Sequence, residues 1–157
     1  DESSKQKAID IACKIIDIFN GVGMFCVEFF VTKDGEVLVN EIAPRPHNSG
    51  HYTIEGCVTS QFENHIRAIL SLPLGSTKLL NPTVMINLLG EEGYKGDTLV
   101  EGIIEALSIE SVFVHIYGKK QTAPKRKMGH VTCLMECLEQ AEKNATKAYH
   151  YIKFISK

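Results

Sequence analysis

The feature that most constrains this chain is an Asp34-Gly35 pair between two runs of β-forming residues. The runs cover residues 23–32 and 36–43 and are rich in Val, Phe, Ile and Leu. An Asp-Gly pair between two such runs is a strong short-range signal for a β-hairpin, because both residues tolerate the left-handed backbone of a tight turn. The sequence therefore predicts an antiparallel hairpin closed by a two-residue turn.

The predicted register brings two glutamates face to face. With a two-residue turn, Val31 pairs with Leu38 and Glu28 pairs with Glu41. The glutamates lie in otherwise apolar strands, and two carboxylates about 4 Å apart at an effective dielectric near 20 repel by roughly 4 kcal/mol. A hard divalent cation such as Mg²⁺ would neutralise the pair, with water and substrate phosphates as its other ligands. Two alternatives stay open: both side chains point into water, or a one-residue bulge breaks the pairing.

Polar and basic residues follow directly after the second strand. The segment from Glu41 to His51 reads Glu-Ile-Ala-Pro-Arg-Pro-His-Asn-Ser-Gly-His. Arg45 has the fork geometry that suits phosphate or carboxylate, and His47 and Asn48 follow it at once. His47 and His51 are spaced i,i+4, which on a helix would indicate zinc, but two prolines and a glycine favour a loop. We therefore expect an anion-binding loop, with a zinc hydrolase centre or a loop without function as the alternatives.

The rest of the chain alternates helical and extended patterns. Apolar periodicity and end signals, among them the capping box Ser60-x-x-Glu63, predict helices over 4–19, 60–72, 101–107 and 138–155. Strands are predicted at 83–89, 111–117 and 128–135, with a polar turn at 90–97 and a basic loop at 118–127. This order indicates an α+β fold with lobes at 1–82 and 83–157, and we expect the hairpin and the helices to share one core.

Composition and charge exclude several classes of protein. The chain has 157 residues, 44% of them hydrophobic and 23% charged, with a formal net charge of -2. No apolar run approaches the roughly 18 to 20 residues that cross a bilayer, and near-neutral charge argues against nucleic-acid binding. Five cysteines without a C-x-x-C pair indicate reduced thiols and a cytoplasmic protein. The chain starts without Met, so we expect it to be a piece of a longer protein.

The hairpin and the loop after it resemble those of ATP-grasp ligases, and among them the carboxyaminoimidazole ribonucleotide synthetases of purine biosynthesis (PurK type). In this family two acidic residues on neighbouring strands hold the magnesium ions that bridge the ATP phosphates. Glu28 matches the first, and Asn40-Glu41 matches the second. The stretch 40–51 is similar to the most specific motif of the PurK branch. The resemblance implies Mg²⁺ held by Glu28 and Glu41, and cofactor contacts from Asn40 and Glu41.

A second segment is similar to the family's basic loop in its small C-terminal lobe. It comprises Tyr117-Gly118-Lys119 and the stretch 126–131. By resemblance, Lys119 and Arg126 grip the phosphate of aminoimidazole ribonucleotide. Lys125 departs from the family, which more often has glycine there. The departure implies a different course of the loop backbone, with Lys127 sharing the phosphate. A solvated basic turn is the alternative.

The resemblance implies the second half of an ATP-grasp domain, an antiparallel sheet with helices, followed by a small C-terminal α/β lobe. It implies an ATP-dependent carbon–nitrogen ligase that forms carboxyphosphate from bicarbonate and carboxylates the amine of aminoimidazole ribonucleotide. Arg45, His47 and Asn48 would stabilise carboxyphosphate and orient the amine, with His47 as a proton acceptor.

The family's N-terminal part and its glycine-rich loop over the nucleotide have no counterpart here, so we expect the isolated chain to be inactive. Another ATP-grasp carboxylate–amine ligase and a noncatalytic phosphate-binding module remain the alternatives. The sequence leaves open whether the protein is a homodimer.

Overall fold

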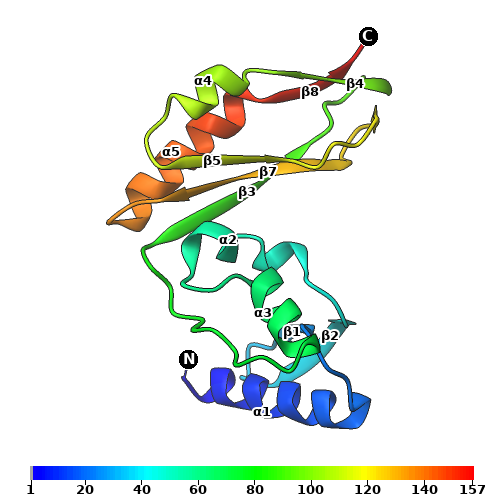
Figure 1. Cartoon of the computed structure of the whole chain (residues 1–157), viewed down its shortest axis with the longest axis vertical. Helices are drawn as coiled ribbons and strands as arrows, with labels where there is room; N and C mark the ends of the chain where they lie inside the picture. The colour runs from blue at the N-terminus through cyan, green and yellow to red at the C-terminus, as the bar shows by residue number, and fades with distance from the viewer. Residues whose placement is uncertain (1) are drawn as a thin grey trace. The chain divides into compact units, whose positions relative to one another are not determined.

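The computed structural model describes residues 2–157 and divides into two compact units (Figure 1). The first unit comprises Asp1–Ile54 and Thr59–Thr77, and the second comprises Glu55–Val58 and Lys78–Lys157. Helices alternate with antiparallel strands, which confirms the predicted α+β class. None of the helices in residues 2–157 has the length and hydrophobicity needed to cross a bilayer.

The elements up to residue 69 follow the predicted order of helix, hairpin, loop and helix. They are α1 (Glu2–Phe19), β1 (Cys26–Val31), β2 (Val37–Ala43), the 3-10 turn η1 (Asn48–Gly50), α2 (Thr53–Gly56) and α3 (Gln61–Ile69). Helix α3 begins after Ser60, whose side chain accepts a hydrogen bond from the N–H of Glu63 at 3.1 Å, as the capping box predicts. The short elements η1 and α2 were not predicted, because three or four residues carry too little periodicity to detect.

The turn of the hairpin is one residue longer than predicted. Gly35 takes a left-handed φ of 77°, and its N–H donates to the carbonyl of Thr32 at 3.0 Å. A glycine in this conformation after a type I turn makes a three-residue connection. Val31 consequently pairs with Val37, and the predicted pairing of Val31 with Leu38 is wrong.

A β-bulge restores the predicted register at the glutamates. Phe29 pairs with Val39, but Glu28 pairs with Glu41, so Asn40 is an extra residue in β2. The longer turn shifts the register by one residue, and the bulge shifts it back. The predicted pairing of the two glutamates is therefore confirmed, although only because the bulge cancels the effect of the longer turn.

Two three-stranded antiparallel sheets organise the second unit, with strand orders β3-β7-β5 and β6-β4-β8. The elements are β3 (Thr83–Leu89), β4 (Gly96–Glu101), α4 (Ile103–Leu107), β5 (Val112–Ile116), β6 (Gln121–Thr122), β7 (Lys127–Leu134), α5 (Leu138–Tyr151) and β8 (Lys153–Ser156). The predicted final helix is too long, because α5 ends at Tyr151 and the chain enters β8, which pairs with β4. Strands β4, β6 and β8 were not predicted.

The hydrophobic core lies in the second unit. Helix α5 runs along one face of the β3-β7-β5 sheet (Figure 1), and alanines on its inner side let it approach the sheet closely. The buried cluster contains Leu88, Ala106, Val112, Met128, Val131, Cys133, Ala145, Ala148, Ile152 and Phe154. Burial raises the pKa of the Cys133 thiol, and the nearby Glu110 carboxylate raises it further, so this thiol stays uncharged in the core.

The first unit has no comparable core. Within its described residues, Ala43 is the only buried hydrophobic residue, while Ile18 is 81% and Phe30 is 60% exposed. A hollow of about 370 Å³ separates α1 from β1. All members of the buried hydrophobic cluster among the described residues belong to the second unit. The core that the hairpin was expected to share with the helices stays a prediction.

Candidate functional site

Glu28 lies at the centre of a group of polar side chains in the first unit. Cys26 and Glu28 are two residues apart on β1, so their side chains share one face of the hairpin. The side-chain amide of Asn40 donates to Oε2 of Glu28 at 3.5 Å, and Nδ1 of His47 lies 3.7 Å from Oε1. The bulge that restores the register thus also provides Asn40 as a neighbour of Glu28.

The loop after β2 turns through His47, which caps η1. Its Nδ1 accepts from the N–H of Ser49 at 3.4 Å and lies 2.9 Å from Oγ of the same serine. Asn48 begins η1 and is half-buried. Arg45 is exposed, and its guanidinium donates to the carbonyl of Pro46 at 3.0 Å. The structure therefore brings His47 to Glu28 and leaves Arg45 at the surface.

Gln61 holds this loop in place and was missed from the sequence. It is buried, its Oε1 accepts from the N–H of His47 at 3.0 Å, and its Nε2 donates to the carbonyl of His47 at 2.8 Å. Its Nε2 also lies 2.9 Å from Nδ1 of His51. A Cβ at Gly50 would lie 2.5 Å from Oε1 of Gln61, so the loop passes too close for a side chain. The only sequence signal is a glutamine at the first helical position, directly after the cap Ser60.

The donor set around Glu28 suits a divalent cation. Glu28 and Glu41 are directly opposed on neighbouring strands, which costs free energy unless a positive charge lies between them or water screens them. Carboxylate oxygens are ligands of the type that Mg²⁺ accepts, and the side chain of Asn40, which donates to Glu28 through its amide nitrogen, lies beside the pair. A tighter group within the described residues contains Cys26, Glu28 and His47, whose ligand atoms all lie within 4.8 Å of one another. Glu41 is not in that group.

The predicted basic loop lies in the second unit. The ammonium of Lys119 donates to the carbonyl of Lys127 at 2.6 Å and lies 5.7 Å from the centre of the Tyr117 ring. The guanidinium of Arg126 donates to the carbonyl of Gln121 at 2.7 Å. The structure therefore brings Lys119 to Lys127 and directs Arg126 toward β6.

Lys125 adopts the conformation that a glycine would favour. Its φ is 62°, in the left-handed region that costs a residue with a Cβ roughly 1–2 kcal/mol. Its N–H donates to the carbonyl of Gly90 at 3.1 Å, and Gly90 in turn donates to the carbonyl of Arg126 at 2.9 Å. The backbone at Lys125 thus takes a conformation that glycine adopts freely; the different course of the loop expected from this departure stays a prediction.

A row of aromatic and ionisable side chains supports the start of the basic loop. The hydroxyl of Tyr117 lies 2.9 Å from Nδ1 of His130, and the ring of His130 stacks on that of His115 with centres 4.4 Å apart. Nε2 of His115 lies 2.6 Å from a carboxylate oxygen of Glu55, which belongs to the same unit. Glu55 and His115 were not predicted, because the stacking depends on the pairing of β5 with β7.

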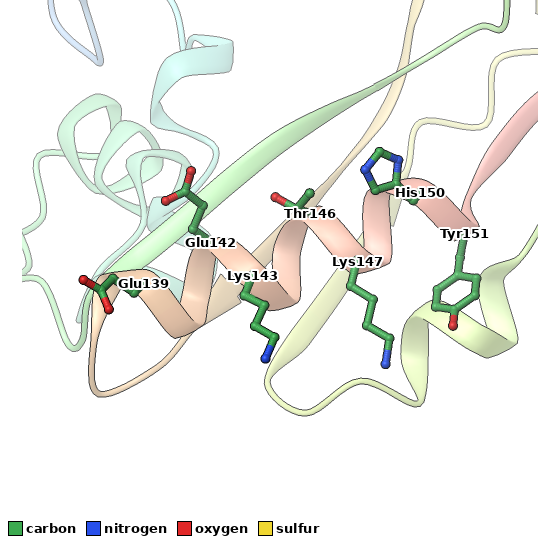
Figure 2. A pocket seen from close by; sticks show the side chains of 7 residues that line it. All are labelled: Glu139, Glu142, Lys143, Thr146, Lys147, His150 and Tyr151. Carbon is green, nitrogen blue, oxygen red and sulfur yellow. The ribbon is translucent and has the colours of Figure 1, made fainter.

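An open hollow of about 720 Å³ follows the outer side of α5 and contains none of the predicted site residues. Figure 2 shows Lys143, Lys147 and Tyr151 on one side of the helix and Glu142 and His150 on the other. The polar groups diverge, so they do not form a convergent set of donors for one ligand.

Comparison with known proteins agrees with this arrangement of motifs. Residues 1–62 match the ATP-grasp domain family, and residues 83–144 match the phosphoribosylaminoimidazole carboxylase C-terminal domain. The chain is 54% identical over 132 residues to the N5-carboxyaminoimidazole ribonucleotide synthase of Bacillus subtilis, covering 84% of this chain and 33% of that protein. The chain thus spans about a third of the length of this curated relative.

Solved structures show the same fold. The N5-carboxyaminoimidazole ribonucleotide synthetase of Thermotoga maritima is 57% identical with a TM-score of 0.90, covering 100% of this chain and 44% of that one. The N5-carboxyaminoimidazole synthase of Aspergillus clavatus, in complex with ADP and aminoimidazole ribonucleotide, is 38% identical with a TM-score of 0.81, covering 96% of this chain and 40% of that one.

Proposed function

Because the chain belongs to the N5-carboxyaminoimidazole ribonucleotide synthase family of ATP-grasp proteins, we propose that it supplies the metal-binding and phosphate-binding parts of such a ligase. The reaction would consume ATP and bicarbonate, carboxylate the amine of aminoimidazole ribonucleotide, and release ADP and phosphate. The chain covers only 33% of the Bacillus subtilis relative, so the whole activity needs residues beyond these. We keep 1–82 and 83–157 as the proposed lobes.

Glu28 and Glu41 are proposed to hold Mg²⁺, with Asn40 beside them on the nucleotide side. When bound, Mg²⁺ would draw charge from the β- and γ-phosphates of ATP and relieve the repulsion between the two carboxylates. The observation that carries the proposal is the Glu28–Glu41 pairing, which the bulge at Asn40 maintains despite the longer turn.

The loop after β2 is proposed to serve the carboxyphosphate step. Arg45 is exposed and has the fork geometry for an anion, and Asn48 can donate to its oxygens. Nδ1 of His47 accepts from the N–H of Ser49, so Nδ1 carries no proton of its own, and it would take the proton of the attacking amine once that contact is released. Gln61 fixes the backbone of His47 from both sides and would act as a positioning residue.

Lys119, Arg126 and Lys127 are proposed to bind the phosphate of the ribonucleotide. All three lie where β6 and β7 meet the basic loop; backbone carbonyls hold the charges of Lys119 and Arg126, and the Tyr117 ring lies near that of Lys119. A phosphate would replace these carbonyl contacts with charge-assisted ones, which are stronger.

The test is a chimera in which this chain replaces the corresponding region of the Thermotoga maritima enzyme. ADP release is measured with Mg²⁺, bicarbonate and aminoimidazole ribonucleotide, each omitted in turn. We expect Glu28→Gln and Glu41→Gln to abolish turnover with the fold intact, and Glu63→Gln, on the surface of α3, to leave it unchanged. Turnover at the parental level in either active-site variant would contradict the metal assignment, and activity without bicarbonate would indicate another ATP-grasp ligase.

The basic loop is tested by substrate dependence. Arg126→Ala should raise the KM for the ribonucleotide about ten- to a hundredfold, because a charge-assisted contact contributes roughly 1.5–3 kcal/mol, and should leave the KM for ATP nearly unchanged. Lys120→Ala, an exposed neighbour, is the control. Equal effects on both substrates would contradict the phosphate assignment.

A further inference from the structure

We propose that Cys26, Glu28 and His47 form a binding site for a thiophilic divalent cation, with Zn²⁺ as the ion that fits best. A thiol, a carboxylate and an imidazole are all ligands that Zn²⁺ accepts, and three such ligands leave a fourth position for water. This site is distinct in its ligands from the proposed magnesium site, which uses Glu41 in place of the sulfur and the imidazole.

The three ligand atoms are close enough to bind one ion. All lie within 4.8 Å of one another, and Nδ1 of His47 is 3.7 Å from Oε1 of Glu28. Ligands about 2.0–2.3 Å from a tetrahedral Zn²⁺ are separated by roughly 3.3–3.8 Å, so the histidine–glutamate distance already fits. The sulfur lies within 4.8 Å of the other two ligand atoms, and Cys26 shares one face of β1 with Glu28, so a small movement of its side chain brings the sulfur to bonding distance.

The site is built on backbone that is already fixed. Cys26 and Glu28 pair with Ala43 and Glu41 in the hairpin ladder, and both peptide groups of His47 are bonded to the buried Gln61. Rigid placement of the ligands reduces the entropy that binding would otherwise cost. All three side chains are half-buried, so water competes less with the ligands than it would on an open surface.

The hydroxyl of Ser49 lies near two of the proposed ligands, His47 and Cys26. It is 2.9 Å from Nδ1 of His47 and 3.7 Å from Sγ of Cys26. On binding, the hydroxyl and the N–H of Ser49 give up their contacts with Nδ1 of His47, the Cys26 thiol releases its proton to solvent, and the sulfur forms its bond to the ion. Nδ1 of His47 donates its lone pair, and Glu28 contributes a carboxylate oxygen without a change of protonation state.

The sulfur and the imidazole make this site selective for Zn²⁺, whereas the glutamate pair alone would favour Mg²⁺. Mg²⁺ prefers oxygen ligands and has little affinity for sulfur, whereas Zn²⁺ binds sulfur and nitrogen strongly. The two ions would compete for Glu28. If the proposed ligase function holds, Zn²⁺ would therefore inhibit by removing a magnesium ligand, although binding itself does not depend on that function.

The experiment titrates the reduced 157-residue chain with Co²⁺ and then displaces Co²⁺ with Zn²⁺. We expect a near-ultraviolet thiolate-to-cobalt charge-transfer band, which Zn²⁺ removes at one equivalent. Cys26→Ser should abolish the band and weaken Zn²⁺ binding by at least about a hundredfold, because Cys26 is a direct ligand and loss of an outer-shell partner alone costs a metal site roughly 10–100-fold. Cys13→Ser and Cys137→Ser, at the two exposed cysteines, should leave both unchanged.

Two further variants keep the test decisive. Glu28→Gln should weaken Zn²⁺ binding while keeping the charge-transfer band, and Glu41→Gln should change neither; circular dichroism checks that each variant is folded. Absence of the band, binding that Cys26→Ser leaves intact, or equal loss in the Cys13→Ser control would overturn the site. These readouts involve no nucleotide, so failure of the ligase proposal and failure of the zinc site are distinguishable.

Discussion

The two units of this chain are stabilised in different ways. The second buries a continuous apolar cluster in which Phe154 and Leu88 are each 1% exposed. The first buries polar side chains instead, with Gln61 and Asn64 bonded to backbone groups of neighbouring loops. The comparison teaches that hydrogen bonds can position a functional loop where apolar packing is sparse, and that such a unit depends on each of its buried polar contacts.

Both units expose large hydrophobic residues, and Ile104 and Leu107 are examples in the second unit. Large hydrophobic residues of α1, β1, β2 and α3 are exposed in the first unit, among them Ile18, Phe19, Phe30, Leu38, Ile66 and Ile69. Exposed apolar area of this kind marks an interaction surface. We expect the first unit to gain more than the second from the additional residues that longer relatives possess.

The largest expected effect tests whether the isolated chain, whose first unit holds the proposed magnesium ligands, is sufficient for catalysis. The isolated chain should release no ADP above background with Mg²⁺, bicarbonate and ribonucleotide, because ATP held only at Glu28 and Glu41 is neither oriented nor shielded from water. The chimera with the Thermotoga maritima enzyme, assayed side by side, should be active. Ribonucleotide-stimulated ADP release from the isolated chain would contradict this prediction.

A matched pair of phenylalanines tests the difference in packing. Phe154→Ala should lower the free energy of unfolding by about 3–5 kcal/mol, because it leaves a cavity in a closed core. Phe30→Ala should change it by less than about 0.5 kcal/mol, because the ring is largely exposed. Urea unfolding followed by circular dichroism measures both. If Phe154→Ala does not fold, Phe154→Leu should still cost about 1 kcal/mol. Equal effects would remove the contrast between the units.

A substitution at Gln61 tests whether hydrogen bonds hold the loop of the first unit. Gln61→Ala should cost about 1–3 kcal/mol, since it leaves buried backbone groups of His47 without their partner. Hydrogen exchange at residues 45–51 should accelerate, while exchange in the β3-β7-β5 sheet stays unchanged. Gln6→Ala, at an exposed position of α1, is the control. Unchanged exchange at 45–51 would show that Gln61 does not clamp the loop.

The smallest expected effect concerns the strained residue in the second unit. Lys125→Gly should stabilise the chain by about 1 kcal/mol, because glycine adopts the left-handed conformation without the penalty of a Cβ. Gly118→Ala should lower the stability by a similar amount, because the φ of Gly118 is 66° and a Cβ is strained there. No neighbour lies within 4 Å of the added Cβ, so backbone strain is the whole expected effect. Thermal unfolding measures both. A loss of stability in Lys125→Gly would mean that the lysine side chain contributes more than its backbone strain costs.

Much of the fold could be predicted because its signals are local. The range predicted for β3 coincides with the observed strand, and α1 and β7 differ from their predictions by no more than two residues at either end. Strands β4 and β8 were missed because each is short and is stabilised by pairing with a segment more than fifty residues away. The final helix was extended too far for the same reason: Lys153–Ser156 carry apolar residues that suit either a helix or a strand until a partner strand is known.

The sequence by itself determined the hairpin and the two motifs by which the family is identified. These depend on turn residues, alternation and spacing, which act over a few residues of chain. Only the tertiary structure decided that a bulge at Asn40 preserves the glutamate pair, that Gln61 holds His47, that Cys26 joins Glu28 and His47, and that the core belongs to one unit. Burial and long-range hydrogen bonds depend on which segments meet in space, and no local pattern encodes that meeting.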